Sequence, residues 1–137
     1  MNIYIQIIKD LSHDNKYLKW YITIIQNAQN RASDKKEAKK LLEYCEKHHI
    51  LPKSFNLGGE KDELNFVYLT AREHFLVHLL MVKFLIQKNL KIKMSVPLLR
   101  MGKKHQNSRL YELARKFTSE NSPSKKKNFK IKDAKQL

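Results

Sequence analysis

The sequence of 137 residues lacks the features of a secreted or membrane protein. Its single cysteine, Cys45, can form no intrachain disulfide, which is typical of proteins from a reducing cell interior. The longest apolar run, residues 75–86, is interrupted by His78 and Lys83 and is too short to cross a bilayer. The apolar stretch at residues 3–8 has neither a basic start nor a small-residue cleavage site, so we expect no signal peptide. We therefore expect a cytoplasmic protein that is not secreted and has no membrane partner.

Acidic residues are missing from a long part of the chain. None occurs between His74 and Tyr111. Residues 1–73 hold 12 Lys and Arg against 10 Asp and Glu, whereas residues 74–137 hold 16 against 3. A charge excess confined to one half is typical of a protein that binds a polyanion, and we favour nucleic acid over a merely solvated surface.

The length fits one domain, within which the patterns predict four segments. Residues 1–43 are expected to be helical, because Tyr17, Tyr21, Ile24 and their neighbours recur at helical spacing. A compact strand–loop–strand–helix unit is expected over residues 44–89. Residues 90–118 are expected to form a basic helical region that binds DNA, and residues 119–137 a basic flexible tail. The predicted class is α+β.

Several element boundaries carry local signals. Ser33 is the expected N-cap of a helix that reaches about Glu43. Strands are expected over residues 44–51 and 65–69, with the loop between them containing Gly58 and Gly59. Thr70 and Glu73 form a capping-box pattern, which predicts a helix from Thr70 to about residue 88. Further helices are expected to start near residues 95–97, where a proline suits a first turn, and over residues 108–117.

Two histidines on the predicted helix could hold a metal ion. His74 and His78 are four residues apart, so their side chains lie on one helix face, one turn apart. A zinc-metalloprotease helix uses the same spacing but needs a glutamate directly after its first histidine, and here Phe75 stands in that place. The alternative is a pair of core or capping histidines with no ligand.

The adjacent pair His48 and His49 lies on the first predicted strand, where neighbouring side chains point to opposite faces. One of the two can join the helix pair as a third ligand, and the other can act on a water molecule as a neutral general base. Three nitrogen ligands leave positions open on a divalent ion, as at a catalytic site. A closed zinc site that adds Cys45 is disfavoured, because Cys45 precedes His48 by three residues and falls on the other strand face.

At these residues the chain resembles the HNH, or ββα-metal, nuclease family, most closely the small phage-encoded HNH homing endonucleases. The resemblance covers residues 44–83 and includes the adjacent histidines, the glycine pair, Asn65 and the stretch from Leu69 to His74. Colicin nucleases have a similar order of histidines and asparagine. The resemblance implies a ββα-metal core flanked by helices and a nuclease that hydrolyses DNA phosphodiester bonds.

The resemblance also implies a role for each matching residue. His48, His74 and His78 would bind one divalent metal ion, Mg²⁺ or, given three histidine ligands, Zn²⁺ or Mn²⁺. His49 would be the general base, Asn65 would orient the His49 loop, and Glu46 would support the site. The partner would be double-stranded DNA, bound through phosphate contacts of the basic half in a host cell's cytoplasm.

Two other functions remain open at this point. A non-enzymatic DNA-binding protein could keep the metal fold as a scaffold, although the intact His49 speaks against it. A toxin nuclease of the colicin kind would need receptor or translocation domains, for which 137 residues leave no room, or an immunity partner. The chain shows no sustained heptads, so we expect a monomer on DNA without excluding a dimer.

Overall fold

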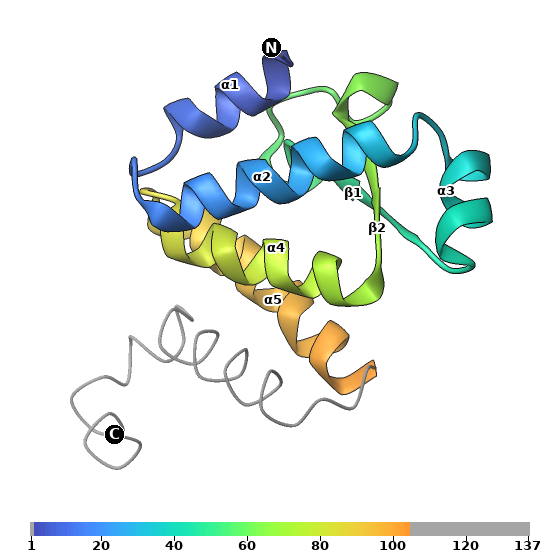
Figure 1. Cartoon of the computed structure of the whole chain (residues 1–137). Helices are drawn as coiled ribbons and strands as arrows, with labels where there is room; N and C mark the ends of the chain where they lie inside the picture. Colours follow the sequence, from blue (N-terminus) through green and yellow to red (C-terminus); the bar gives the residue numbers. More distant parts are fainter. Residues whose placement is uncertain (1, 105–137) are drawn as a thin grey trace.

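The computed structural model describes residues 2–104, which form five α-helices and a two-stranded antiparallel sheet (Figure 1). The predicted α+β class is confirmed. In chain order the elements are α1 (Ile3–Asp10), α2 (Lys16–Arg31), α3 (Lys35–Leu42), β1 (Glu46–His49), the short 3-10 helices η1 (Lys53–Phe55) and η2 (Glu63–Asn65), β2 (Phe66–Leu69), α4 (Ala71–Phe84) and α5 (Lys88–Lys104).

The expected N-terminal helical region consists of three separate helices. Asn2, Asn15 and Asp34 cap α1, α2 and α3 by accepting backbone N–H bonds in the first turn. The predicted cap at Ser33 is therefore wrong by one residue, because the carboxylate of Asp34 accepts the Glu37 N–H. Along α2 one face is buried, formed by Leu18, Tyr21, Ile25 and Ala28.

The sheet is a hairpin of two four-residue strands. Glu46 pairs with Leu69 at one end and His49 with Phe66 at the other. Residues 50–65 connect the strands, and both Gly58 (φ 95°) and Gly59 (φ 78°) adopt left-handed backbone conformations there. At Gly59 a Cβ atom would clash with the ring of Tyr4, so α1 packs directly on this connection. Both strands are shorter than expected.

Helix α4 starts as predicted and ends earlier than predicted. The Thr70 hydroxyl accepts the Glu73 N–H while the Glu73 carboxylate accepts the Thr70 N–H, which completes the capping box. The helix stops at Phe84 rather than near residue 88, because Leu85 is extended and forms a β-bridge with Ser12. The break is reinforced by the His13 N–H, which donates to the Phe84 carbonyl over 2.8 Å.

Helix α5 begins at Lys88, and Pro97 lies inside it, so the expected helix start at residues 95–97 is wrong. Leu90, Met94 and Leu98 recur every four residues and are buried, which offsets the backbone hydrogen bond that a proline removes. Helix α4 thus lies between α2 and α5 (Figure 1). The predicted helix over residues 108–117 and the tail from residue 119 lie outside the described residues, and the division into four segments stays a prediction.

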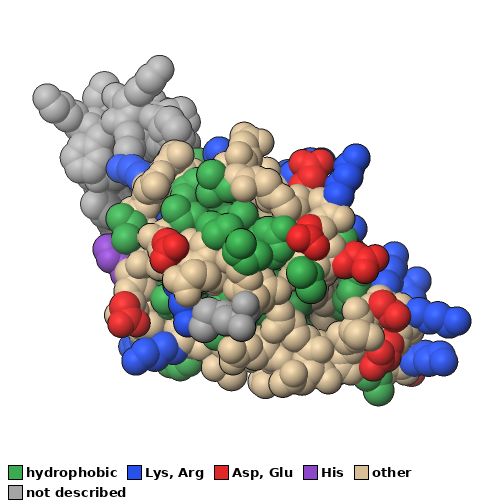
Figure 2. Space-filling view, turned by 90° about the horizontal axis from the view of Figure 1, so that it is seen from above, with side chains coloured by type: hydrophobic (Ala, Val, Ile, Leu, Met, Phe, Trp, Pro, Cys, Tyr) green, Lys and Arg blue, Asp and Glu red, His purple; other side chains and the backbone are tan. Residues whose placement is uncertain are grey.

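Charge and apolar side chains are unevenly distributed over the surface. The face seen from above, which carries α1, gathers hydrophobic side chains with acidic ones around them, while many lysines and arginines project at one edge (Figure 2). Exposed apolar residues include Ile3 on α1. In contrast, residues 74–104 hold seven Lys and Arg and no acidic residue. No helix within residues 2–104 is long and apolar enough to span a membrane.

A candidate metal centre between β1 and α4

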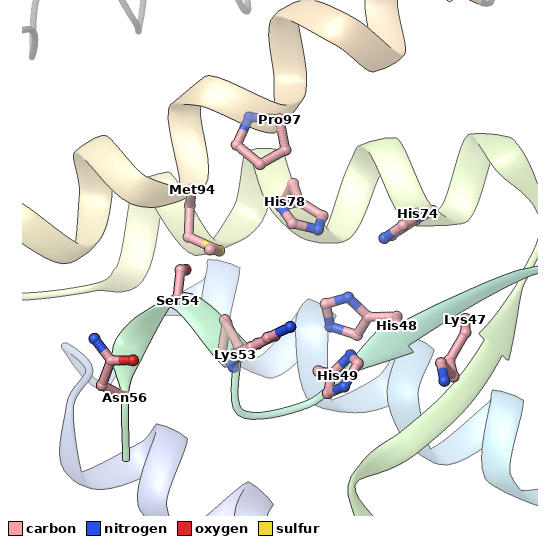
Figure 3. Close-up of a pocket in the computed structure, with 11 residues that line it drawn as sticks. Lys47, His48, His49, Lys53, Ser54, Asn56, His74, His78, Met94 and Pro97 are labelled. Carbon is pink, nitrogen blue, oxygen red and sulfur yellow. The ribbon is translucent and has the colours of Figure 1, made fainter. Parts of the chain in front are cut away.

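Three histidines converge where β1 faces the first turns of α4. His48 comes from the strand, and His74 and His78 come from one face of the helix. One nitrogen from each ring lies within 4.8 Å of the other two, and the ring centroids are 4.9–5.4 Å apart (Figure 3). This spacing allows the three side chains to hold a single metal ion. Cys45 is not a member of the group.

Burial keeps two of these imidazoles neutral. His48 and His78 are only 2% and 7% exposed. Desolvation lowers the pKa of His48 well below its ordinary value, and repulsion from His78 and His74 lowers it further. The pKa of His78 is lowered to about 3, again mainly by desolvation and then by His74. A metal ion binds the neutral imidazole, so these buried rings are in the ligand form at neutral pH, and the donor set fits a divalent ion.

Each of two ligand candidates has a polar partner on its other side. The Glu46 carboxylate lies 2.9 Å from Nδ1 of His74, which leaves Nε2 of that ring for a ligand bond. Because strand side chains alternate, Glu46 and His48 share a face of β1, which brings this carboxylate to α4. The Tyr21 hydroxyl of α2 lies 3.0 Å from Nε2 of His48.

His49 lies on the opposite face of β1 and is not part of the three-histidine group. Its Nε2 donates to the carbonyl of Glu60 over 3.0 Å, which leaves Nδ1 as the atom that carries the lone pair. The ring also packs edge-on against Phe66. Both His48 and His49 nevertheless line one cleft, because the strand ends there and the chain turns away.

Asn65 is fully buried and joins the two ends of the connection between the strands. Its Oδ1 accepts the Leu51 N–H over 2.7 Å, and its Nδ2 donates to the carbonyls of Leu51 and Gly59. The backbone carbonyl of Asn65 accepts the Ile50 N–H. Four hydrogen bonds thus hold the chain on both sides of the Glu60 carbonyl that contacts His49. The residue ends η2 and precedes β2 instead of opening the strand.

The histidines open into a cleft of about 470 Å³. Lys47 and Lys53 line its β1 side, and Met94 and Pro97 of α5 line the opposite side (Figure 3). Lys93 of α5 donates to the carbonyl of Ser54, which ties α5 to η1 at the rim. An open, positively charged cleft is suited to an anionic ligand with access to the metal group.

The structure brings together all six residues that the sequence singled out: three in the metal group, His49 in the same cleft, and Glu46 and Asn65 as hydrogen-bond partners. Three other contributions were missed. Tyr21 contacts His48, Arg31 binds Glu73, and α5 supplies one wall of the cleft. The apolar periodicity of α2 marked Tyr21 as core but gave no sign of its polar contact.

Comparison with known proteins finds relatives in Enterobacteria phage T4. Over 67 residues, 49% of this chain, the sequence is 46% identical to a protein named "Probable mobile endonuclease D", of which this stretch covers 24%. It is 43% identical over the same length to "Probable mobile endonuclease B" and "Probable mobile endonuclease E", covering 24% and 41% of them. The matched stretch is thus less than half the length of each relative. No family model matches the chain, and no solved structure does.

Proposed function

We propose that the chain is a metal-dependent DNA endonuclease of the HNH type. The observation that carries the proposal is the placement of three imidazoles, from His48, His74 and His78, in the same cleft as His49. The names of the phage T4 relatives agree with an endonuclease. Within the core, β1, β2 and α4 would constitute the ββα-metal motif, and α1, α2 and α5 would flank it.

The three-histidine group would hold one divalent ion. When bound, such an ion neutralises charge that grows on the scissile phosphate and the leaving oxygen in the transition state. Glu46 would orient His74 through Nδ1, so that the ring presents Nε2 to the ion.

His49 would act as the general base. Its Nε2–H is held by the Glu60 carbonyl, so Nδ1 is the atom that would take the proton of the attacking water. Asn65 would keep that carbonyl in place through its bonds to Leu51 and Gly59. A fixed ring orientation matters because proton transfer requires the base within hydrogen-bond reach of the water.

DNA would be held by phosphate contacts beside the cleft. Lys47 and Lys53 line it, and Lys93 and Arg100 extend the positive charge along α5. Such contacts release counterions and do not read sequence, so they explain affinity without assigning a target site.

A plasmid-nicking experiment tests the proposal. Supercoiled plasmid, including one that carries DNA neighbouring the gene, is incubated with the protein and Mg²⁺, Mn²⁺ or Zn²⁺, with and without chelator. We expect open-circular product that requires a divalent ion, and loss of both cleavage and metal affinity in His74→Ala. The exposed His13, replaced by alanine, is the matched control and should retain both.

A second candidate function is a DNA-binding protein without catalysis, which would use the same metal group as a scaffold. It predicts salt-sensitive DNA binding and metal binding by calorimetry, with no cleavage under any of the three ions. Cleavage that survives chelator would contradict both candidates.

A further inference from the structure

Tyr21 lies beneath the metal group, on the buried face of α2. Its exposed fraction is 0%, and its ring packs edge-on against Phe84 (5.1 Å between centroids) and His48 (6.0 Å). Phe84 on α4 and His48 on β1 therefore hold the ring in one orientation, which fixes the position of its hydroxyl. A buried tyrosine hydroxyl needs hydrogen-bond partners, and this one has two, His48 and Ile50.

The two partners together determine where the protons lie. The Tyr21 oxygen is 3.2 Å from the Ile50 carbonyl oxygen, which can only accept, so the single hydroxyl proton points there. A lone pair of the hydroxyl then faces Nε2 of His48 at 3.0 Å, and that nitrogen must be the donor. A phenol is protonated at neutral pH, so the hydroxyl has one proton to donate.

We propose that Tyr21 is a positioning residue that keeps the proton of His48 on Nε2 and its ligand lone pair on Nδ1. His74 is held the opposite way, with Nδ1 toward Glu46 and Nε2 left for the metal ion. His48 and His74 would thus bind the ion through different nitrogen atoms, each selected by the hydrogen-bond partner of the other nitrogen. The assignment of protons stands on the hydrogen bonds alone, while its consequence for metal binding rests on the proposed function.

The first test needs neither metal nor activity. Metal-free protein labelled with ¹⁵N in histidine is examined by long-range ¹H–¹⁵N correlation NMR at neutral pH, which distinguishes the two neutral imidazole tautomers. We expect His48 to carry its proton on Nε2. A proton on Nδ1 would overturn the proposal, whatever the protein does to DNA.

The second test uses Tyr21→Phe, which removes the hydroxyl and keeps the ring. We expect Zn²⁺ or Mn²⁺ affinity, measured by calorimetry, to fall by about 10–100-fold, the range typical for loss of such a partner. Tyr17→Phe on the same helix is the matched control, because Tyr17 contacts Trp20 rather than the histidines and should leave the affinity unchanged. Thermal unfolding of both metal-free variants checks that the fold is kept.

The outcomes distinguish the positioning role of Tyr21 from the proposed nuclease activity. Equal metal affinity in Tyr21→Phe and the wild type would overturn the positioning role. Wild-type protein that binds metal with His48 protonated on Nε2 but never cuts DNA would leave the role intact and contradict the nuclease. If Tyr21→Phe fails to fold, the tautomer of the wild-type protein still decides.

Discussion

Arg31 and Glu73 form a two-pronged ion pair that joins the end of α2 to the start of α4. The Arg31 Nη1 and Nη2 atoms lie 3.1 and 2.9 Å from the two carboxylate oxygens, and Nη2 also donates to the Tyr68 carbonyl over 2.9 Å. Glu73 is the capping-box residue of α4 and immediately precedes His74. The pair therefore anchors the helix turn that carries a candidate metal ligand.

We expect Arg31→Met to lower the free energy of unfolding by about 1–2 kcal/mol. The value is modest because both side chains are partly exposed, but the variant removes three hydrogen bonds made by a charged group. Arg31→Lys should restore only part of it, since an ammonium cannot replace the two-pronged geometry. Urea unfolding measures the effect, with exposed Lys35→Met as the control. An Arg31→Met protein as stable as the wild type would mean that water replaces the pair.

His49→Ala should separate catalysis from metal binding. Loss of a general base costs about 10²–10⁴ in rate, whereas the three-histidine group does not include this residue. Cleavage rates and calorimetric metal affinity are measured on the same preparation, with His13→Ala as the control. A parallel loss of metal affinity would show that His49, and not His48, supplies the ligand.

The stability of the metal-free protein should fall as the pH drops from about 6.5 toward 3. The pKa of His78 is about 3 in the folded chain against 6.5 for an unperturbed histidine, so within this window the unfolded state binds more protons. Each such histidine contributes up to about 1.4 kcal/mol per pH unit. Urea unfolding with chelator at several pH values measures the slope. His78→Gln should reduce the slope of the unfolding free energy against pH, and the control His13→Gln should not. An unchanged slope in His78→Gln would contradict the attribution of this pH dependence to His78.

Lys53→Gln combined with Arg100→Gln should weaken DNA binding and its salt dependence. For duplex DNA, each cation that no longer neutralises a phosphate reduces the slope of log affinity against log salt by about 0.9. Lys53 lines the cleft and Arg100 is exposed on α5, so the double variant removes one positive charge in η1 and one on α5. Lys35→Gln with Lys36→Gln on α3 is the charge-matched control. Equal slopes for the two double variants would place the DNA grip elsewhere.

One protomer should nick one strand in each encounter. The described residues contain one three-histidine group beside one candidate base, and such a site attacks one phosphate at a time. Supercoiled plasmid with a single target site, followed at limiting protein, should accumulate open circles first. Linear product that forms first, with second-order dependence on protein, would indicate that a symmetric dimer cuts both strands.

Short-range sequence patterns were sufficient to predict the start of α4 and the face on which its two histidines lie. The capping box placed the start of α4, and the four-residue spacing placed His74 and His78 on one face. The end of α4 was not predictable, because it depends on the bridge between Ser12 and Leu85, which lie 73 positions apart. The predicted helix start near Pro97 failed because burial of Leu90, Met94 and Leu98 carries α5 through the proline.

The partners of the site were harder to predict than the site. Tyr21 contacts His48 across 27 positions and Arg31 contacts Glu73 across 42, and such pairs leave no periodic pattern in the sequence. The helical spacing of Tyr21 marks it as a core residue of α2. This pattern is the same whether the hydroxyl bonds a backbone carbonyl or a ligand histidine.

The break at Leu85 makes α5 return along α4, so that one helix carries Met94 and Pro97 of the cleft wall as well as the cations Lys93 and Arg100 (Figure 1). The position of this cleft wall and the directions of the α5 cations therefore both depend on the rotation of one helix about its axis. One residue inserted between Leu90 and Met94 would rotate everything downstream by about 100°. Met94 and Pro97 would leave the cleft, and the exposed Arg100 would point in a new direction at the same time. The number of residues in this part of α5 is therefore constrained even at positions where the identity of the surface residue is not.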